Sequence, residues 1–182
     1  MIPVGYMAKR VATHPDWLRA DQVKDIYSVS NCVSRDFADY INFWRHNGYW
    51  LFDSPRIIIE LAVEHNLSLG DVKFFYYEVY EQQWDEDAST WKPFEPEAAF
   101  TTRVEVPPQK CLEGYDVVSF WGQTAPECSY LSCNSMAATL DVNEHCLIST
   151  FGEAKRLVES KVFENCEPGP CRIFAVYSLS GD

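Results

Sequence analysis

The stretch YWLFDSPRIIIELAVEHN, residues 49–66, contains the clearest change of secondary structure in the chain. Residues 49–53 are typical of a strand. Ser54 is a preferred N-cap residue, and Pro55 suits the first turn of a helix because its fixed backbone angle is already helical. The residues after it are apolar, except for one charged side chain every four positions at Arg56, Glu60 and Glu64. We therefore expect a strand that leads into a mostly buried helix.

The C-terminal half of the chain has a similar pattern. Thr150 and Glu153 have the spacing of a capping box before an amphipathic helix, and residues 145–149 and 171–179 read as strands. Four residue pairs lie 96 positions apart, and two more lie 97 apart: Asn47 and Asn143, Leu51 and Leu147, Ser54 and Thr150, Leu61 and Leu157, then Val79 and Val176, Tyr80 and Tyr177. We interpret residues 24–81 and 113–179 as two strand–helix–strand units of an internal repeat.

Further elements follow from local patterns. Residues 34–48 have apolar side chains at helical spacing, with Ser34 as N-cap and Gly48 as a stop. A short helix is expected from Pro15 and a strand over residues 24–30. Residues 71–84 predict a long strand, and 85–90 the turn of a hairpin. Because the crossovers favour parallel pairing and the hairpin requires antiparallel pairing, we predict an α+β fold. Residues 1–182 would form one domain, with a mixed, mainly antiparallel sheet and helices packed on it.

Composition restricts the classes of function. The chain is 47% hydrophobic and 15% aromatic, which is typical of a globular domain, and it contains no apolar run of about 18 residues that could span a bilayer. The net charge is −12, and residues 51–100 hold eleven acidic residues against three basic ones. This charge argues against ordinary nucleic-acid binding. It favours a basic protein partner, with nucleic-acid mimicry as an alternative.

The seven cysteines suggest a reducing compartment. Their number is odd, and the start of the sequence shows no secretory signal, so we expect reduced thiols in the cytoplasm. Cys128 and Cys133, together with Cys166 and Cys171, form two C-x4-C pairs that could supply four thiolates to zinc. This spacing differs from the usual C-x2-C, and a chain of this length needs no metal to fold. The sequence therefore favours ordinary cysteines without a metal or other cofactor.

Cys133 is the candidate nucleophile of a cysteine-dependent hydrolase or transferase. It precedes a possible short helix, whose positive end would lower the pKa of its thiol, and Asn134 could orient a base or bind an oxyanion. His145 is the nearest histidine in sequence, although the helix should place it out of reach. His46 is the alternative base.

The predicted hairpin supports a third interpretation. Trp84 and Trp91 flank the acidic residues Asp85, Glu86 and Asp87. Packing of the two rings across the strands is the simpler expectation. If the rings are exposed, this segment is an acidic, aromatic recognition surface. Because the spacing in the sequence supports no complete set of catalytic residues, we favour a binding or regulatory protein over an enzyme.

Overall fold

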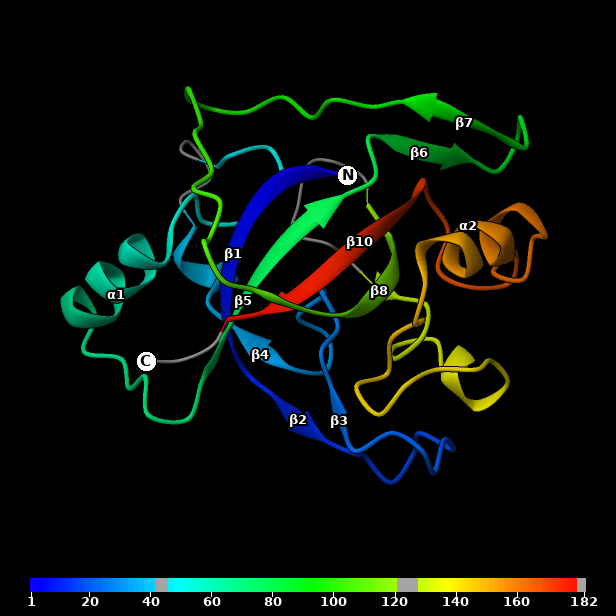
Figure 1. The fold of residues 1–182 in the computed structure, drawn as a ribbon, viewed down its shortest axis with the longest axis horizontal. Helices are drawn as coiled ribbons and strands as arrows, with labels where there is room; N and C mark the ends of the chain where they lie inside the picture. The colour runs from blue at the N-terminus through cyan, green and yellow to red at the C-terminus, as the bar shows by residue number, and fades with distance from the viewer. Residues whose placement is uncertain (42–45, 121–127, 180–182) are drawn as a thin grey trace.

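A curled antiparallel sheet forms the centre of the computed structural model, which describes residues 1–41, 46–120 and 128–179 (Figure 1). The strands of this sheet are β1 (Ile2–Arg10), β4 (Arg35–Asp36), β5 (Lys73–Val79), β6 (Gln82–Asp85), β7 (Thr90–Pro93), β8 (Cys111–Ser119), β9 (Cys128–Ser129) and β10 (Cys171–Ser178). Their order is β4-β1-β5-β10-β6-β7, and β8 pairs with both β10 and β9. The pairings recorded between these strands are all antiparallel. A separate small sheet contains β2 (Ala12–Thr13) and β3 (Asp25–Ile26).

Two α-helices flank the sheet on opposite sides (Figure 1). α1 (Pro55–Glu64) contacts β1, and α2 (Phe151–Glu159) contacts β8 and β10. Short 3-10 helices, η1 (Ala38–Tyr40) and η3 (Met136–Ala138), lie in the connections. The α+β class and the mainly antiparallel sheet are therefore confirmed. The parallel component expected from the crossovers is not found between the strands that the structure describes: β1 and β5, which precede and follow α1, pair antiparallel, and so do β8 and β10, which precede and follow α2.

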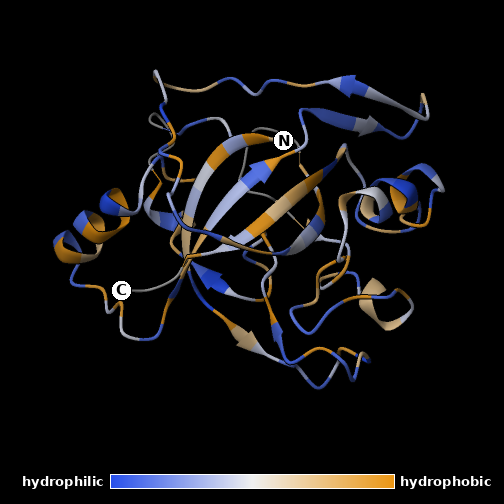
Figure 2. Ribbon diagram, in the orientation of Figure 1, coloured by the Kyte–Doolittle hydropathy of each residue, from blue (hydrophilic) through white to orange (hydrophobic). Residues whose placement is uncertain are grey.

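The helix that follows Ser54 has one buried face. It begins at Pro55 as predicted, with Ser54 as N-cap. Only Ile58 and Ala62 are buried in it, whereas Ile59 is 47% exposed and Val63 is 78% exposed. The expectation of a mostly buried helix is wrong, because α1 packs against the sheet from one side only. Figure 2 shows the resulting alternation of hydrophobic and hydrophilic residues along α1.

The helix expected over residues 34–48 does not form in the described part of that segment. The Ser34 hydroxyl bonds to both strands of the small sheet, donating to the carbonyl of Ile26 in β3 at 2.8 Å and accepting the N–H of Ala12 in β2 at 3.1 Å. β4 and η1 follow instead of a continuous helix, and residues 42–45 lie outside the described residues. The short helix from Pro15 is replaced by turns, and the strand over 24–30 is reduced to β3. Tertiary hydrogen bonds thus override the helical pattern here.

The junctions that lead into α1 and α2 have the same geometry. The side-chain amide of Asn47 donates to the carbonyl of Val4 at 2.9 Å, and its oxygen accepts the N–H groups of Tyr49 and Leu51. Asn143 repeats this arrangement, with its amide donating to Glu113 at 2.7 Å and its oxygen accepting two N–H groups, from His145 and Leu147. Gly5 directly follows Val4, and Gly114 directly follows Glu113, the two residues whose carbonyls accept these amide N–H groups. Both glycines have positive φ angles, +133° and +150°.

The strand register relates the two halves more closely. Gly5 pairs with Tyr77 on β5, and Gly114 pairs with Val176 on β10, each beside a register shift. Tyr77 and Val176 are 99 residues apart, whereas the sequence comparison paired residues of β5 and β10 that are 97 apart. The match by register is therefore shifted by two residues. In this respect β1 resembles β8, since each strand contains a glycine that pairs beside a register shift.

Candidate metal centre

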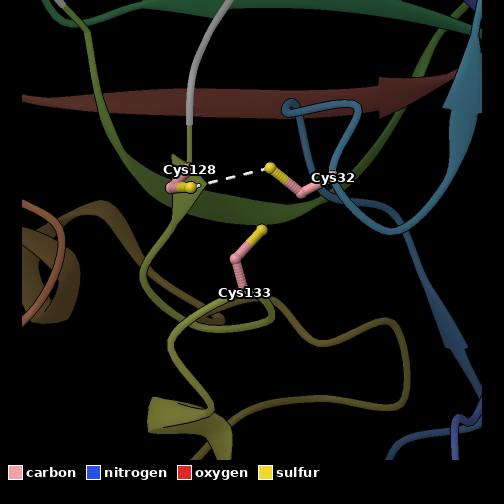
Figure 3. A group of neighbouring side chains, drawn as sticks. All are labelled: Cys32, Cys128 and Cys133. Carbon is pink, nitrogen blue, oxygen red and sulfur yellow. Dashed lines mark hydrogen bonds between the residues drawn. The ribbon is translucent and has the colours of Figure 1, made fainter.

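Three cysteines from distant parts of the chain meet at one end of the sheet (Figure 3). Cys32 lies in the loop after β3, Cys128 in β9, and Cys133 in the turn after β9. Their sulfur atoms all lie within 4.8 Å of one another, and the Sγ atoms of Cys32 and Cys128 are 3.6 Å apart. All three thiols are free of disulfide bonds. This is the only such group of metal-binding side chains within residues 1–41, 46–120 and 128–179.

The turn after β9 returns Cys133 to the side of Cys128. β9 pairs with the end of β8, where Ser119 lies opposite Cys128. The N–H of Cys133 then donates to the carbonyl of Ser129 at 2.9 Å, and the N–H of Ser132 to the Ser129 hydroxyl at 3.3 Å. These bonds close the five-residue spacing into a compact turn. The C-x4-C pair of the sequence is therefore a local unit of the site.

The loop before Cys32 wraps around a buried lysine. The Lys9 side chain is fully buried, and its ammonium donates to the carbonyls of Ser28, Val29 and Ser30 at 2.8, 3.0 and 2.6 Å. Three carbonyl acceptors match the three donors of a protonated amine. A carboxylate oxygen of Asp36 lies 3.5 Å from the nitrogen of the Lys9 ammonium. Burial lowers the pKa of Lys9, while Asp36 and other anionic groups oppose that change. Lys9 therefore fixes the backbone of residues 28–30, which leads to Cys32.

Asp116 joins the two cysteine-bearing segments. This β8 carboxylate is fully buried, accepts the N–H of Val29 at 2.8 Å and accepts the hydroxyl of Ser129 at 2.6 Å. Val29 precedes Cys32 by three residues, and Ser129 directly follows Cys128. Burial raises the pKa of Asp116 to about 6, although its hydrogen bonds act in the opposite direction. One buried side chain thus holds both loops in register.

The three thiols differ in their electrostatic surroundings. A hydrogen bond to Cys32, together with burial, raises the pKa of Cys133 well above its ordinary value. The same bond lowers the pKa of Cys32, which is exposed. Burial raises the pKa of Cys128. The hydroxyl of Ser30 lies 3.5 Å from the Cys133 sulfur. Cys32 is therefore the thiol of the cluster whose pKa is shifted downward.

The residues predicted for cysteine catalysis are not brought together. The Nδ1 atom of His145 is paired with Asp25, and its ring stacks on Tyr27 at 4.0 Å. The Nδ1 atom of His46 accepts the N–H of Gly48 at 3.1 Å, and its ring stacks on Trp50 at 4.4 Å.

The remaining members of the predicted catalytic set also lack a suitable arrangement. Asn134 does follow Cys133 into the turn, but its side-chain oxygen is buried without a hydrogen-bond partner. The hydrogen bond to Cys32 and burial raise the pKa of Cys133, whereas a helix end would lower it, and η3 begins only at Met136. We find no support for Cys133 as an activated nucleophile.

The second C-x4-C pair lies elsewhere. Cys171 is buried on β10 opposite Trp84 of β6, and Cys166 packs against the same core cluster. Cys128 and Cys133 instead acquire Cys32 as their partner. The sequence missed Cys32 because it lies 96 residues from Cys128 and belongs to no local motif. The 96-residue offset that aligns the two halves also relates Cys32 to Cys128, and it is the one sequence signal that could have selected Cys32.

The hairpin of β6 and β7 buries Trp84 and leaves Trp91 half-buried. Trp84 is 6% exposed and lies opposite Trp91, with ring centroids 5.3 Å apart. The indole N–H of Trp91 donates to Glu159 of α2 at 2.9 Å. The rings pack across the strands, as the simpler expectation had it, and Trp91 also contacts α2. Asp85 pairs with Lys92, which leaves Glu86 and Asp87 as the exposed acids at the turn.

Comparisons of the chain with protein-family models, with curated proteins and with solved structures find no match. Among residues 1–41, 46–120 and 128–179, no helix has both the length and the apolar character needed to cross a membrane.

Proposed function

We propose that this protein binds a soft divalent metal ion, zinc, through the thiolates of Cys32, Cys128 and Cys133. The observation that carries the proposal is the convergence of three sulfurs from two segments of the chain. Tetrahedral zinc with Zn–S bonds of about 2.3 Å requires sulfurs about 3.8 Å apart. The Cys32 and Cys128 sulfurs are 3.6 Å apart before any metal is added.

The chemistry of the donor set favours zinc over hard cations. Thiolates are soft ligands, whereas calcium and magnesium select oxygen donors. A divalent ion with three thiolates carries a net charge of −1. The buried ammonium of Lys9 lies beneath the site, bonded to the carbonyl of Ser30, whose hydroxyl contacts Cys133. Its positive charge would offset this anionic complex, as outer groups commonly do around metal sites.

The metal would have a structural effect. Cys32 lies between β3 and β4, whereas Cys128 and Cys133 belong to the connection after β8. Coordination would join these connections at the surface, directly above the link that Asp116 makes in the interior. Because such sites fix their ligands only in the folded state, metal binding adds to folding stability.

The compartment and the partner belong to the same proposal. Metal thiolates persist where thiols stay reduced, which favours the cytoplasm. The net charge of −12 and the exposed Glu86 and Asp87 support a basic protein partner over nucleic acid. In this proposal the acids guide association, and the metal site shapes the neighbouring loops.

The test is metal content. Reduced protein, loaded with zinc and freed of excess ion, should contain one zinc per chain by elemental analysis. Replacing Cys32, Cys128 or Cys133 with serine should remove most of it. Cobalt(II) in place of zinc should give thiolate charge-transfer absorption that each of these variants weakens.

Two cysteines outside the cluster serve as controls. Cys111→Ser removes an exposed thiol, and Cys166→Ser removes one member of the other C-x4-C pair. Both variants should retain zinc. Failure of the wild-type protein to bind zinc, or loss of zinc from Cys166→Ser, would contradict the proposed ligand set.

A further inference from the structure

From the geometry of the cluster, we infer that Cys32 is a reversible oxidation site, which reacts with hydroperoxides and is resolved by Cys128 into an intramolecular disulfide. The oxidation itself requires only the thiols. Its control by metal rests on the function proposed above, because the same two sulfurs would be zinc ligands.

The cluster combines an accessible thiol with a partner thiol at short range. Cys32 is exposed, so a small oxidant can reach it, whereas Cys128 is half-buried beside it. Their sulfurs are 3.6 Å apart, and a disulfide requires about 2.05 Å. A small movement of the Cys32 loop brings the two sulfurs to bonding distance. The two cysteines are 96 residues apart in sequence, so a disulfide between them would close a long loop.

The reaction proceeds in two balanced steps. The Cys32 thiolate attacks one oxygen of the hydroperoxide, an S–O bond forms, the O–O bond breaks, and an alkoxide or hydroxide leaves and takes up a proton. Cys32 is thereby oxidised by two electrons to a sulfenic acid. The Cys128 sulfur then attacks the Cys32 sulfur, so the S–S bond forms and the S–O bond breaks. The hydroxyl leaves as water with the proton of Cys128.

Metal and oxidation would compete for the same atoms. Zinc coordination engages the electron pairs that attack the peroxide, and the disulfide removes two of three metal ligands. Cys133 would remain as a single thiol, which is insufficient to retain the ion. The site would therefore release zinc when it is oxidised and rebind it after reduction by a small thiol.

The experiment compares three thiols within the native protein. Metal-free, reduced protein is treated with hydrogen peroxide, alkylated at intervals, digested without reduction and analysed by mass spectrometry. The expected product is the Cys32–Cys128 disulfide. Because the Cys128 sulfur lies 3.6 Å away, the second step is intramolecular, so Cys32 should appear as the disulfide, whereas exposed Cys111 should stop at a sulfenic acid that dimedone traps. In Cys128→Ser, Cys32 should instead accumulate as a sulfenic acid that dimedone traps.

The outcomes separate the two proposals. Accumulation of Cys32 as a sulfenic acid in the wild-type protein, or a disulfide in any other pairing, would overturn the inference. Disulfide formation in a protein that binds no zinc would support the oxidation site while the proposed metal function fails. Zinc binding without this disulfide would leave the metal function and reject the oxidation site. In zinc-loaded protein, both proposals together predict disulfide formation slowed about 10-fold, with zinc released in proportion.

Discussion

At the scale of single residues, Asp116 couples the interior to pH. Its pKa is raised from 3.8 to about 6 because burial disfavours the carboxylate. When folding raises the pKa of a group, its contribution to stability is fully present at pH values below the pKa that it has in the unfolded chain. That contribution is lost as the pH rises through about 6. Asp116→Asn keeps the shape and stays neutral at every pH, so this part of the pH dependence should disappear.

The expected size of the Asp116 effect follows from the change in pKa. Between pH 4 and pH 7.5, the free energy of unfolding of the wild-type protein should fall by about 2–2.5 kcal/mol relative to Asp116→Asn. Urea denaturation of metal-free, reduced protein at several pH values measures this difference. Asp87→Asn, at the exposed hairpin turn, is the control and should follow the wild-type curve within about 0.5 kcal/mol. Parallel curves for wild type and Asp116→Asn would show that Asp116 titrates normally.

At the scale of elements, α1 offers two adjacent isoleucines in opposite surroundings. Ile58 is fully buried against the sheet, whereas Ile59 is 47% exposed. Ile58→Ala should lower the free energy of unfolding by about 2–5 kcal/mol, through lost burial and the cavity left behind. Ile59→Ala should cost less than about 1 kcal/mol, because alanine favours helix and little buried area is lost. Chemical denaturation of both variants checks the orientation of α1, and equal losses would contradict it.

The hairpin of β6 and β7 agrees with one expectation from the sequence, that the two tryptophans pack across the strands, and not with the alternative, that both are exposed. Its strands, turn and cross-strand pair of tryptophans follow from the sequence. The same pairing, however, takes Trp84 out of solvent, so the element contributes to the core beside α2. Figure 2 shows that the colours of β6 and β7 are largely hydrophilic. Residue hydropathy alone therefore does not reveal that this hairpin buries a large ring.

At the scale of the whole molecule, we propose that the two halves arose by duplication of one strand–loop–helix–strand unit. The support is the set of repeated contacts: the asparagine at each helix junction, the glycine with positive φ opposite it, and the register shift beside that glycine. β4 pairs with β1 much as β9 pairs with β8. The two halves meet where β5 pairs antiparallel with β10.

Equivalent glycines should respond equally to substitution. A Cβ on Gly5 would lie 2.7 Å from the Cβ of Leu51, and one on Gly114 would lie 2.8 Å from the Cβ of Leu147. Both positions also have a φ that side chains rarely adopt. Gly5→Ala and Gly114→Ala should each destabilise the protein by more than about 1 kcal/mol. Gly152→Ala, in α2 with open space around it, should be neutral or stabilising.

Thermal denaturation of the three glycine variants measures this equivalence. A large loss at only one of the two junctions would contradict the structural match between the halves. A large loss at Gly152 would show that alanine is poorly tolerated for reasons unrelated to the junction.

The sequence by itself determined the features that depend on near neighbours. Pro55 in the first turn of α1, the cap that Thr150 makes to the N–H of Glu153, the two helices and the hairpin turn all depend on residues that are close in sequence. The junction repeat was visible for the same reason, since Asn47 and Asn143 bond mainly to their own loops. The α+β class follows from these elements together.

Only the tertiary structure decided which distant residues meet. Hydrophobic burial drives collapse without direction, so a pattern of apolar residues cannot specify that Cys32 reaches Cys128. That contact depends on the curl of the sheet and on two buried charges, Lys9 and Asp116, whose hydrogen bonds must be satisfied once water is excluded. The helix expected after Ser34 was lost for the same reason, because its backbone supplies contacts to other segments. The candidate metal centre is therefore a property of the folded chain.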